Sequence, residues 1–238
     1  MNLPLWKRIG LNRLMKSESE ELLMIIQKRM DYMWKRRRSL FFLIFYIVWA
    51  LKEVIFRDHH DATFALIFVK IVIWIIPVFL FLRYLECNHK PFSYLKLNTN
   101  IRRGILWGSI VSLLLILIEG TLITVTHTRF NLDLGWRWIT TFVFALPEEV
   151  LFRGFILRGL NDSIGFKKAN IITAVLFVSI HFPVWFIQGI VLPKLVFNII
   201  VVFIVGVALG YLFKRTNSLW SATIVHTVYN LLIYTRSV

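Results

Sequence analysis

Cysteine is almost absent from this sequence: Cys87 is the single one among 238 residues. An intrachain disulfide and a metal site built from several cysteines are therefore both excluded. Acidic residues are also scarce, with 13 Asp and Glu against 28 Lys and Arg, which gives a formal net charge of +15. The chain shows no internal repeat, no low-complexity tract and no flexible linker. These absences argue against a disulfide-rich domain and against a repeat architecture.

Polar residues are scarce in this chain: 58% of the residues are hydrophobic, and the mean hydropathy is +0.69. A soluble domain is nearer half apolar. The apolar residues come in long blocks, and about seven spans of about 20 residues would take most of the chain. Little remains for a separate soluble catalytic domain. Any chemistry is therefore expected inside the membrane or at its edge.

The blocks predict an all-α fold, a polytopic bundle of about seven transmembrane helices, with six to eight compatible with the pattern. The expected spans cover residues 39–57, 62–84, 104–126, 136–158, 169–187, 195–213 and 219–235. The predicted regions are a basic segment at 1–38, two spans with a cytoplasmic loop at 39–100, and a catalytic helix bundle at 101–238. Gly206 and Gly210 form a small-x-x-x-small pair on the sixth span, which is typical of closely packed helices.

Positive charge is concentrated before the first expected span, where ten Lys and Arg fall between Lys7 and Arg38. A basic helix over about 18–38 is predicted to lie on the inner leaflet and to contact anionic lipids. Lys and Arg are also denser in alternate connections, which predicts a multi-pass protein of the cell membrane with a cytoplasmic N-terminus. Lipid contact accounts for the net charge, so nucleic acid is not expected as a partner.

Three ionisable residues fall within one and a half turns of the fourth expected span, at Glu148, Glu149 and Arg153. A charge near the bilayer centre costs about 2.5–3.5 kcal/mol on insertion scales, so such residues need internal partners. Glu149 and Arg153 are four positions apart, which predicts an ion pair on one helix face. Glu148 is rotated by about 100° from that face, so it is expected to face a cavity, where it can act as a general base toward water. Pro147 has no N–H and is expected to disturb the helix here.

Two later spans supply further polar groups, His181 on the fifth and His226 with Asn230 on the seventh. A single histidine in an apolar helix is more often a packing or hydrogen-bonding residue. The coincidence of these groups with the glutamates on three spans favours a site. Together they offer a general base, an imidazole that positions water, and donors to a developing oxyanion, which suits amide hydrolysis. Outside this set, the main mid-span ionisable residues are Lys70 and Glu119.

A zinc site is the alternative interpretation of the same residues. Glu148, His181 and His226 can supply three ligands and leave a fourth position open to water. The H-E-x-x-H arrangement of many zinc proteases is absent. Because Glu and His can also activate water alone, the leading interpretation requires no cofactor, and zinc remains the alternative.

Three motifs can be read in order along the chain: Glu148-Glu149-x-x-x-Arg153, Phe177-x-x-x-His181 and His226-x-x-x-Asn230. In order and approximate spacing they resemble the signature motifs of the CPBP family. This is the Abi/CAAX prenyl-endopeptidase family of intramembrane glutamic proteases, and the chain is more similar to its bacterial branch. The resemblance covers about residues 100–235. It implies a helix bundle with a conical cavity that opens to the membrane and to one aqueous side.

The resemblance also implies a role for each motif residue. Glu148 would activate the attacking water together with His181, and Glu149 would assist while paired with Arg153. The histidine and the asparagine of the third motif would stabilise the oxyanion. Bacterial members are linked to bacteriocin immunity, peptide processing and envelope regulation, so the expected substrate is a membrane-associated peptide or protein.

Two interpretations from other functional classes remain open. A non-catalytic scaffold or immunity protein would use the same helices to bind a membrane partner, such as a sensor kinase or a toxin receptor. Such a protein would tolerate Glu148→Gln, whereas a protease would not. Intramembrane Glu, His and Arg are also typical of transporters. Many transporters are built from two related halves, and no two-fold repeat is evident in this sequence.

Overall fold

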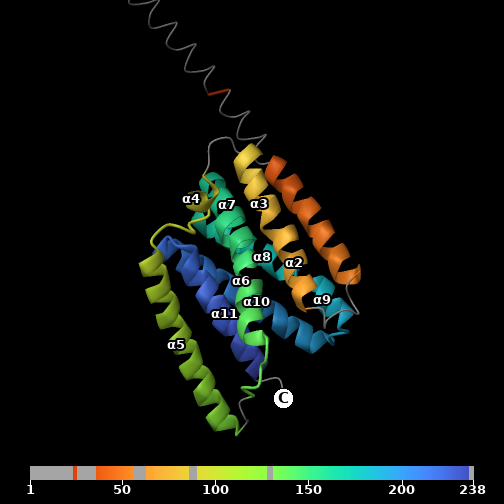
Figure 1. The fold of residues 1–238 in the computed structure, drawn as a ribbon, viewed down its shortest axis with the longest axis vertical. Helices are drawn as coiled ribbons and strands as arrows, with labels where there is room; N and C mark the ends of the chain where they lie inside the picture. The colour runs from red at the N-terminus through yellow and green to blue at the C-terminus, as the bar shows by residue number, and fades with distance from the viewer. Residues whose placement is uncertain (1–23, 26–35, 56–62, 86–89, 128–130, 236–238) are drawn as a thin grey trace, which may run out of the picture. The chain divides into compact units, whose positions relative to one another are not determined.

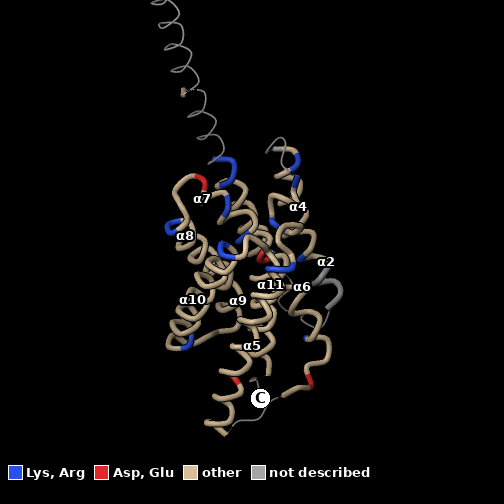
Figure 2. The backbone as a smooth tube through the Cα atoms, turned by 90° about the vertical axis from the view of Figure 1, so that its left-hand side faces the viewer, with Lys and Arg blue, Asp and Glu red and all other residues tan. Residues whose placement is uncertain are grey.

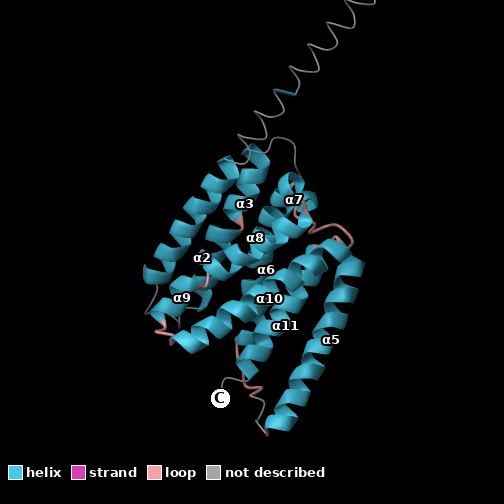
Figure 3. Ribbon diagram, turned by 180° about the vertical axis from the view of Figure 1, so that it is seen from behind, coloured by secondary structure: helices cyan, strands magenta, loops and turns pink. Residues whose placement is uncertain are grey.

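The computed structural model describes residues 24–25, 36–55, 63–85, 90–127 and 131–235. Regular structure in these residues is helical throughout, and no strand occurs among them (Figure 3). The predicted all-helical class is confirmed. The predicted lipid-binding helix at 18–38 and Cys87 fall mostly or wholly outside the described residues.

The chain divides into two compact units, Met1–Val48 and Trp49–Val238, and each is described by itself. In the first unit, residues 36–48 are helical, and the rings of Phe42 and Phe45 lie 6.2 Å apart. The second unit begins with helical residues 49–55. All the motif residues belong to the second unit.

The elements of the second unit follow the expected spans closely. They are α2 (Thr63–Trp74), α3 (Ile76–Leu80), the wide π-type helix η1 (Phe81–Leu85), α4 (Pro91–Tyr94), α5 (Ile101–Thr126), α6 (Arg137–Glu149), the π-type helix η2 (Val150–Leu157), α7 (Arg158–Ile164), α8 (Phe166–Ser179), α9 (Phe182–Ile187), α10 (Leu192–Thr216) and α11 (Leu219–Thr235). Helices satisfy their backbone hydrogen bonds internally, which is what an apolar surrounding demands.

Three stretches are long and apolar enough to cross a membrane, judged by length and composition: Ile101–Thr126, Phe166–Ile187 and Leu192–Thr216. On α5, the side chains of Leu113, Leu117 and Ile118 are each more than half exposed. Exposed apolar surface of this kind suits contact with lipid rather than water. A membrane protein is therefore indicated, while the full number of seven spans stays a prediction.

The helix α11 is central to the second unit. It packs against α5 most extensively, and also against α6 and α10 (Figure 1). In addition α8 packs on α10 and on η2, and α2 packs on α6. The three segments that carry the motifs, α6 with η2, α8 with α9, and α11, are thereby brought together.

Positive charge in the second unit is unevenly placed. Lys and Arg gather where α4, α7 and the start of α8 lie (Figure 2). These include Lys90, Arg158, Lys167 and Lys168. This agrees with the asymmetry of the connections, and the orientation of the chain in the membrane remains a prediction.

The two glycines of α10 lie where α8 approaches. A Cβ on Gly206 would be 3.2 Å from the Cβ of Ala174, and a Cβ on Gly210 would fall on the side-chain amide of Asn170. That amide donates a hydrogen bond to the carbonyl of Val207 at 3.0 Å. The close packing predicted from the small-x-x-x-small pair is confirmed.

We expect Gly210→Ala to destabilise the folded protein by about 1–3 kcal/mol, because the added methyl group must displace Asn170. Gly120→Ala on α5 is the matched control, since a Cβ there meets no atom within 4 Å. Thermal unfolding of both purified variants in the same detergent measures the difference. Equal midpoints for the two variants would contradict the packing argument.

Candidate active site

Glu149, the last residue of α6, lies at the centre of a buried polar cluster. Its Oε1 accepts a hydrogen bond from Arg153 Nη1 at 2.8 Å and another from His226 Nδ1 at 2.7 Å. Arg153 Nη2 donates in turn to the carbonyl of Gly206 at 3.1 Å. Glu149 and Arg153 are fully buried. Hydrogen bonds between such charged groups are the strong ones, so this cluster ties α6, η2, α10 and α11 together.

The helix changes its form where these residues lie. Pro147 is inside α6, and from Val150 to Leu157 the backbone adopts the wider π-type helix η2. Proline removes one backbone donor, and π-type turns within helices are frequent at functional sites. The disturbance predicted from Pro147 is thus found just beyond it. The predicted ion pair between Glu149 and Arg153 is formed across this transition.

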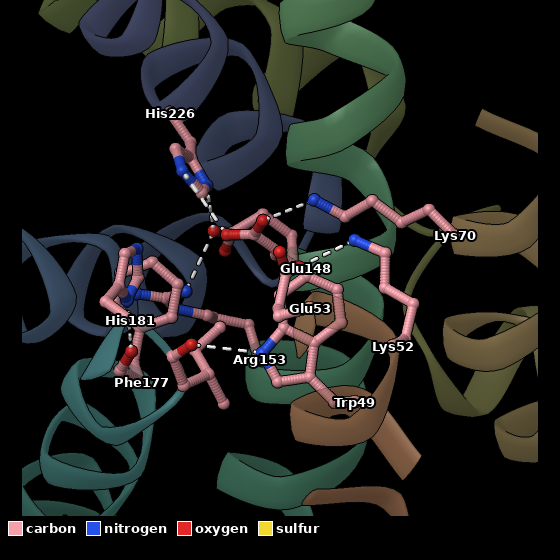
Figure 4. A network of polar contacts seen from close by, with 11 residues as sticks. Trp49, Lys52, Glu53, Lys70, Glu148, Arg153, Phe177, His181 and His226 are labelled. Carbon is pink, nitrogen blue, oxygen red and sulfur yellow. Dashed lines mark hydrogen bonds and ion pairs between the residues drawn. The ribbon is translucent and has the colours of Figure 1, made fainter. Parts of the chain in front are cut away.

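Glu148 has a different set of partners from Glu149, and Figure 4 shows its carboxylate facing Lys70. Its Oε1 forms an ion pair with Lys70 Nζ at 2.6 Å, and its Oε2 lies 3.8 Å from His226 Nε2. The Glu148 side chain is 13% exposed. As expected, Glu149 pairs with Arg153 and Glu148 has other partners. Glu148 was expected to face a cavity, and in the structure it contacts Lys70 of α2.

His181 lies at the break between α8 and α9. Its Nδ1 is 2.8 Å from the carbonyl oxygen of Phe177. A carbonyl can only accept, so Nδ1 carries the proton and Nε2 of a neutral ring is left with its lone pair. The imidazole lies against Trp185, with ring centres 5.4 Å apart. The break itself is anchored by Trp49, whose Nε1 donates to the carbonyl of Ile180 at 3.0 Å.

Phe177 separates and positions the two histidines. Its ring makes edge contacts with His181 at 5.2 Å and with His226 at 5.6 Å between centres. The guanidinium of Arg153 lies over the same ring at 4.5 Å. The first residue of the second motif is therefore a packing residue at the centre of the site.

Asn230 follows His226 by four residues on α11, so both lie on one side of that helix. Its side chain is partly exposed. No hydrogen bond joins that side chain to another residue in the described part of the chain. Of the six predicted residues, Glu148, Glu149, Arg153 and His226 form one bonded cluster, His181 joins it through Phe177, and Asn230 lies one turn further along.

The zinc alternative requires three protein ligands grouped around one point. Among the residues that the structure describes, no three His, Cys, Asp or Glu side chains are grouped closely enough to hold a metal ion. Glu148 Oε1 is occupied by Lys70, and His226 Nδ1 by Glu149. These contacts do not engage Glu148 Oε2 or the Nε2 atoms of His181 and His226, so zinc stays the alternative prediction.

The order and the contacts of these residues can be compared with known families. Residues 130–232 match the family described as type II CAAX prenyl endopeptidase, Rce1-like. Over this segment the chain is similar to that family. The match includes all six predicted site residues and confirms the resemblance inferred from the three motifs. Searches of curated proteins and of solved structures gave no match.

The Rce1-like family is a family of CAAX-type intramembrane endopeptidases, which supports protease activity in general. The match to a membrane protease family agrees with the three long apolar helices, and together they indicate a membrane protein. Lys70 and Trp49 lie outside the matched segment and belong to no motif. A lone lysine inside an apolar run is the sequence signal that could have placed Lys70 in the site.

Proposed function

We propose that the protein is an intramembrane endopeptidase that hydrolyses a peptide bond of a membrane-associated peptide or protein with an activated water. The observation that carries the proposal is the continuous chain of contacts Arg153–Glu149–His226–Glu148, in which the first three residues are buried. These residues come from two separate motifs of the Rce1-like segment. Burying several charged groups together is costly unless they are paired, and such groups inside a membrane helix mark functional sites.

Glu148 and His181 are the catalytic residues that act on water in this proposal. Glu148 Oε2 accepts a proton from the water, and the water oxygen attacks the carbonyl carbon of the substrate. The lone pair on His181 Nε2 accepts the second hydrogen bond of the same water and so directs it. Collapse of the tetrahedral intermediate breaks the C–N bond. The proton held by Glu148 passes to the leaving nitrogen, so the products are a carboxylic acid and an amine.

The third motif would hold the oxygen that becomes negative during attack. His226 Nδ1 donates to Glu149, and its Nε2 lies on the side of Glu148, where an Nε2–H would donate to the oxyanion. The amide of Asn230 is a second donor on the same side of α11. Donors fixed in advance around a developing oxyanion are usually the largest electrostatic contribution to catalysis. Glu149 and Arg153 are positioning residues here, because they orient His226 without touching substrate.

The test compares three strains: a deletion, the deletion with the wild-type gene, and the deletion with Glu148→Gln at matched membrane levels. Mass spectrometry of membrane peptides and their termini then identifies precursors that only the wild type cuts. We expect the Glu148→Gln strain to accumulate the same uncut precursor as the deletion. Identical peptide sets in the wild-type and Glu148→Gln strains would overturn the protease proposal in favour of a non-catalytic scaffold.

The proposed mechanism uses the Glu148 carboxylate and the His181 imidazole to activate water, and it includes no metal ion. We expect cleavage of the precursor by purified protein to continue at an unchanged rate after treatment with 1,10-phenanthroline or EDTA. The measurement is the initial rate before and after the chelator, with a known zinc protease as the positive control. Loss of activity that added Zn²⁺ restores would instead support the zinc alternative.

A further inference from the structure

Lys70 is buried in α2 and makes a direct contact with the proposed general base. It is 8% exposed, and its Nζ lies 2.6 Å from Glu148 Oε1. The two residues are 78 positions apart. The family match covers residues 130–232, so Glu148 lies within the matched segment and Lys70 lies outside it.

Aromatic rings surround the rest of the ammonium group. Its Nζ is 4.7 Å from the ring centre of Phe144, 5.1 Å from that of Trp74 and 6.0 Å from that of Trp49. Ring faces attract a cation but accept no conventional hydrogen bond. Among the described residues, Glu148 supplies the single hydrogen-bond acceptor for Lys70. The ammonium group of Lys70 is therefore held by the carboxylate of Glu148 (Figure 4).

The charges of the site form two pairs. Arg153 neutralises Glu149 from the same stretch of helix, one turn away. Glu148 has no such cation on its own helix among the described residues, and the charge opposite it comes from Lys70 on α2. His226 of α11 lies 3.8 Å from Glu148, and His181 and Lys52 also interact electrostatically with its carboxylate. A buried carboxylate without a cation becomes neutral by taking a proton, and a protonated carboxyl cannot accept one from water.

The same contact also sets the direction of Glu148. Lys70 holds Oε1, so Oε2 is the oxygen left on the side of His226. We propose that Lys70 is a positioning residue for the reaction: its ammonium keeps Glu148 as an oriented carboxylate that can take a proton from water. This inference rests on the proposed function, because it gives Glu148 the part of general base.

Lys52 provides a matched control. It is also a lysine of the second unit, it pairs with a glutamate, Glu53, at 2.6 Å, and it lies 4.3 Å from the ring centre of Trp49. No hydrogen bond connects it to Glu148 within the described residues. Lys52→Met removes the same charge from the same neighbourhood and leaves the Lys70–Glu148 pair in place.

The first experiment measures cleavage of the precursor by purified Lys70→Met, Lys70→Gln, Lys70→Arg and Lys52→Met in liposomes. We expect Lys70→Met and Lys70→Gln to lower kcat at least about tenfold with KM nearly unchanged, because the base is lost while substrate contacts remain. Lys70→Arg restores a cation and is expected to recover most of kcat. Wild-type kcat in Lys70→Met would overturn the inference. A higher kcat would also overturn it, since Lys70 would then be masking the base.

The second experiment needs no substrate and reads the charge of Glu148 directly. Infrared difference spectra are recorded between each protein and its Glu148→Gln counterpart, in the wild-type and in the Lys70→Met or Lys70→Gln background. We expect carboxylate bands in the wild-type difference and a protonated carboxyl band when Lys70 is replaced. Carboxylate bands in every background would overturn the inference. If Glu148→Gln cleaves like wild type, the proposed function fails, while the spectra still decide whether Lys70 keeps Glu148 ionised.

Discussion

Purified Glu148→Gln is expected to hydrolyse the precursor about 10²–10⁴-fold more slowly than wild type, the contribution typical of a general base. The amide that replaces the carboxylate keeps its size and can still accept hydrogen bonds, but it cannot take a proton from water. Glu148 is also 13% exposed rather than fully buried, so the fold should tolerate the change. Initial rates at equal protein concentration in liposomes measure the loss.

Glu53→Gln is the control for that substitution. Glu53 pairs with Lys52 in the second unit, so its replacement removes a nearby paired carboxylate that is not part of the three motifs. We expect its rate to equal that of wild type, and both variants to reach the membrane at the normal level. Turnover by Glu148→Gln at the wild-type rate would show that the carboxylate is not the base.

Arg153→Ala is expected to destabilise the protein by about 3–5 kcal/mol, the effect of breaking a buried ion pair on one side. Arg153 and Glu149 are both fully buried, and the guanidinium also binds the carbonyl of Gly206 and lies over Phe177. A loss of this size is a large part of the stability of a typical domain. The measurement is the amount of protein in the membrane together with its thermal midpoint in detergent.

The double variant Glu149→Gln/Arg153→Met separates charge imbalance from lost packing. It removes both charges, keeps an oxygen near His226, and fills much of the space left by the guanidinium. We expect it to recover a substantial part of the stability lost in Arg153→Ala, since no unpaired charge remains. Its catalytic rate should remain low, because the carboxylate that accepts the hydrogen bond from His226 Nδ1 has been replaced by an amide. If both variants are equally unstable, the buried ion pair is not the reason for the loss.

The local parts of the site were predictable from residue spacing. Glu149 and Arg153 are four positions apart, and the ion pair expected between them forms at 2.8 Å. Contacts of this type depend only on helix periodicity and on side-chain length. The disturbance after Pro147 follows from the missing N–H for the same local reason.

The long-range parts of the site were not predictable in the same way. His226 was assigned to the oxyanion through the family resemblance, and the structure adds that its Nδ1 is held by Glu149, 77 residues away. Lys70 was recognisable as an unusual mid-span charge, but its partner could not be read from the sequence. Pairing across helices depends on how far each helix is rotated about its axis and how deeply it is placed. Neither quantity is recorded in the hydrophobic pattern of a single chain.

The sequence by itself determined the helical class, the apolar segments, the three motifs and the close approach at Gly206 and Gly210. Each of these follows from composition or from spacing along one helix. Only the tertiary structure decided which groups meet across helices: Lys70 with Glu148, and His226 with the oxygen of Glu149 that also binds Arg153. The physical reason is that buried charges in an apolar bundle must find partners wherever packing places them. In this protein, helix packing brings Lys70 of α2 to Glu148, whereas Arg153 of the first motif pairs with Glu149.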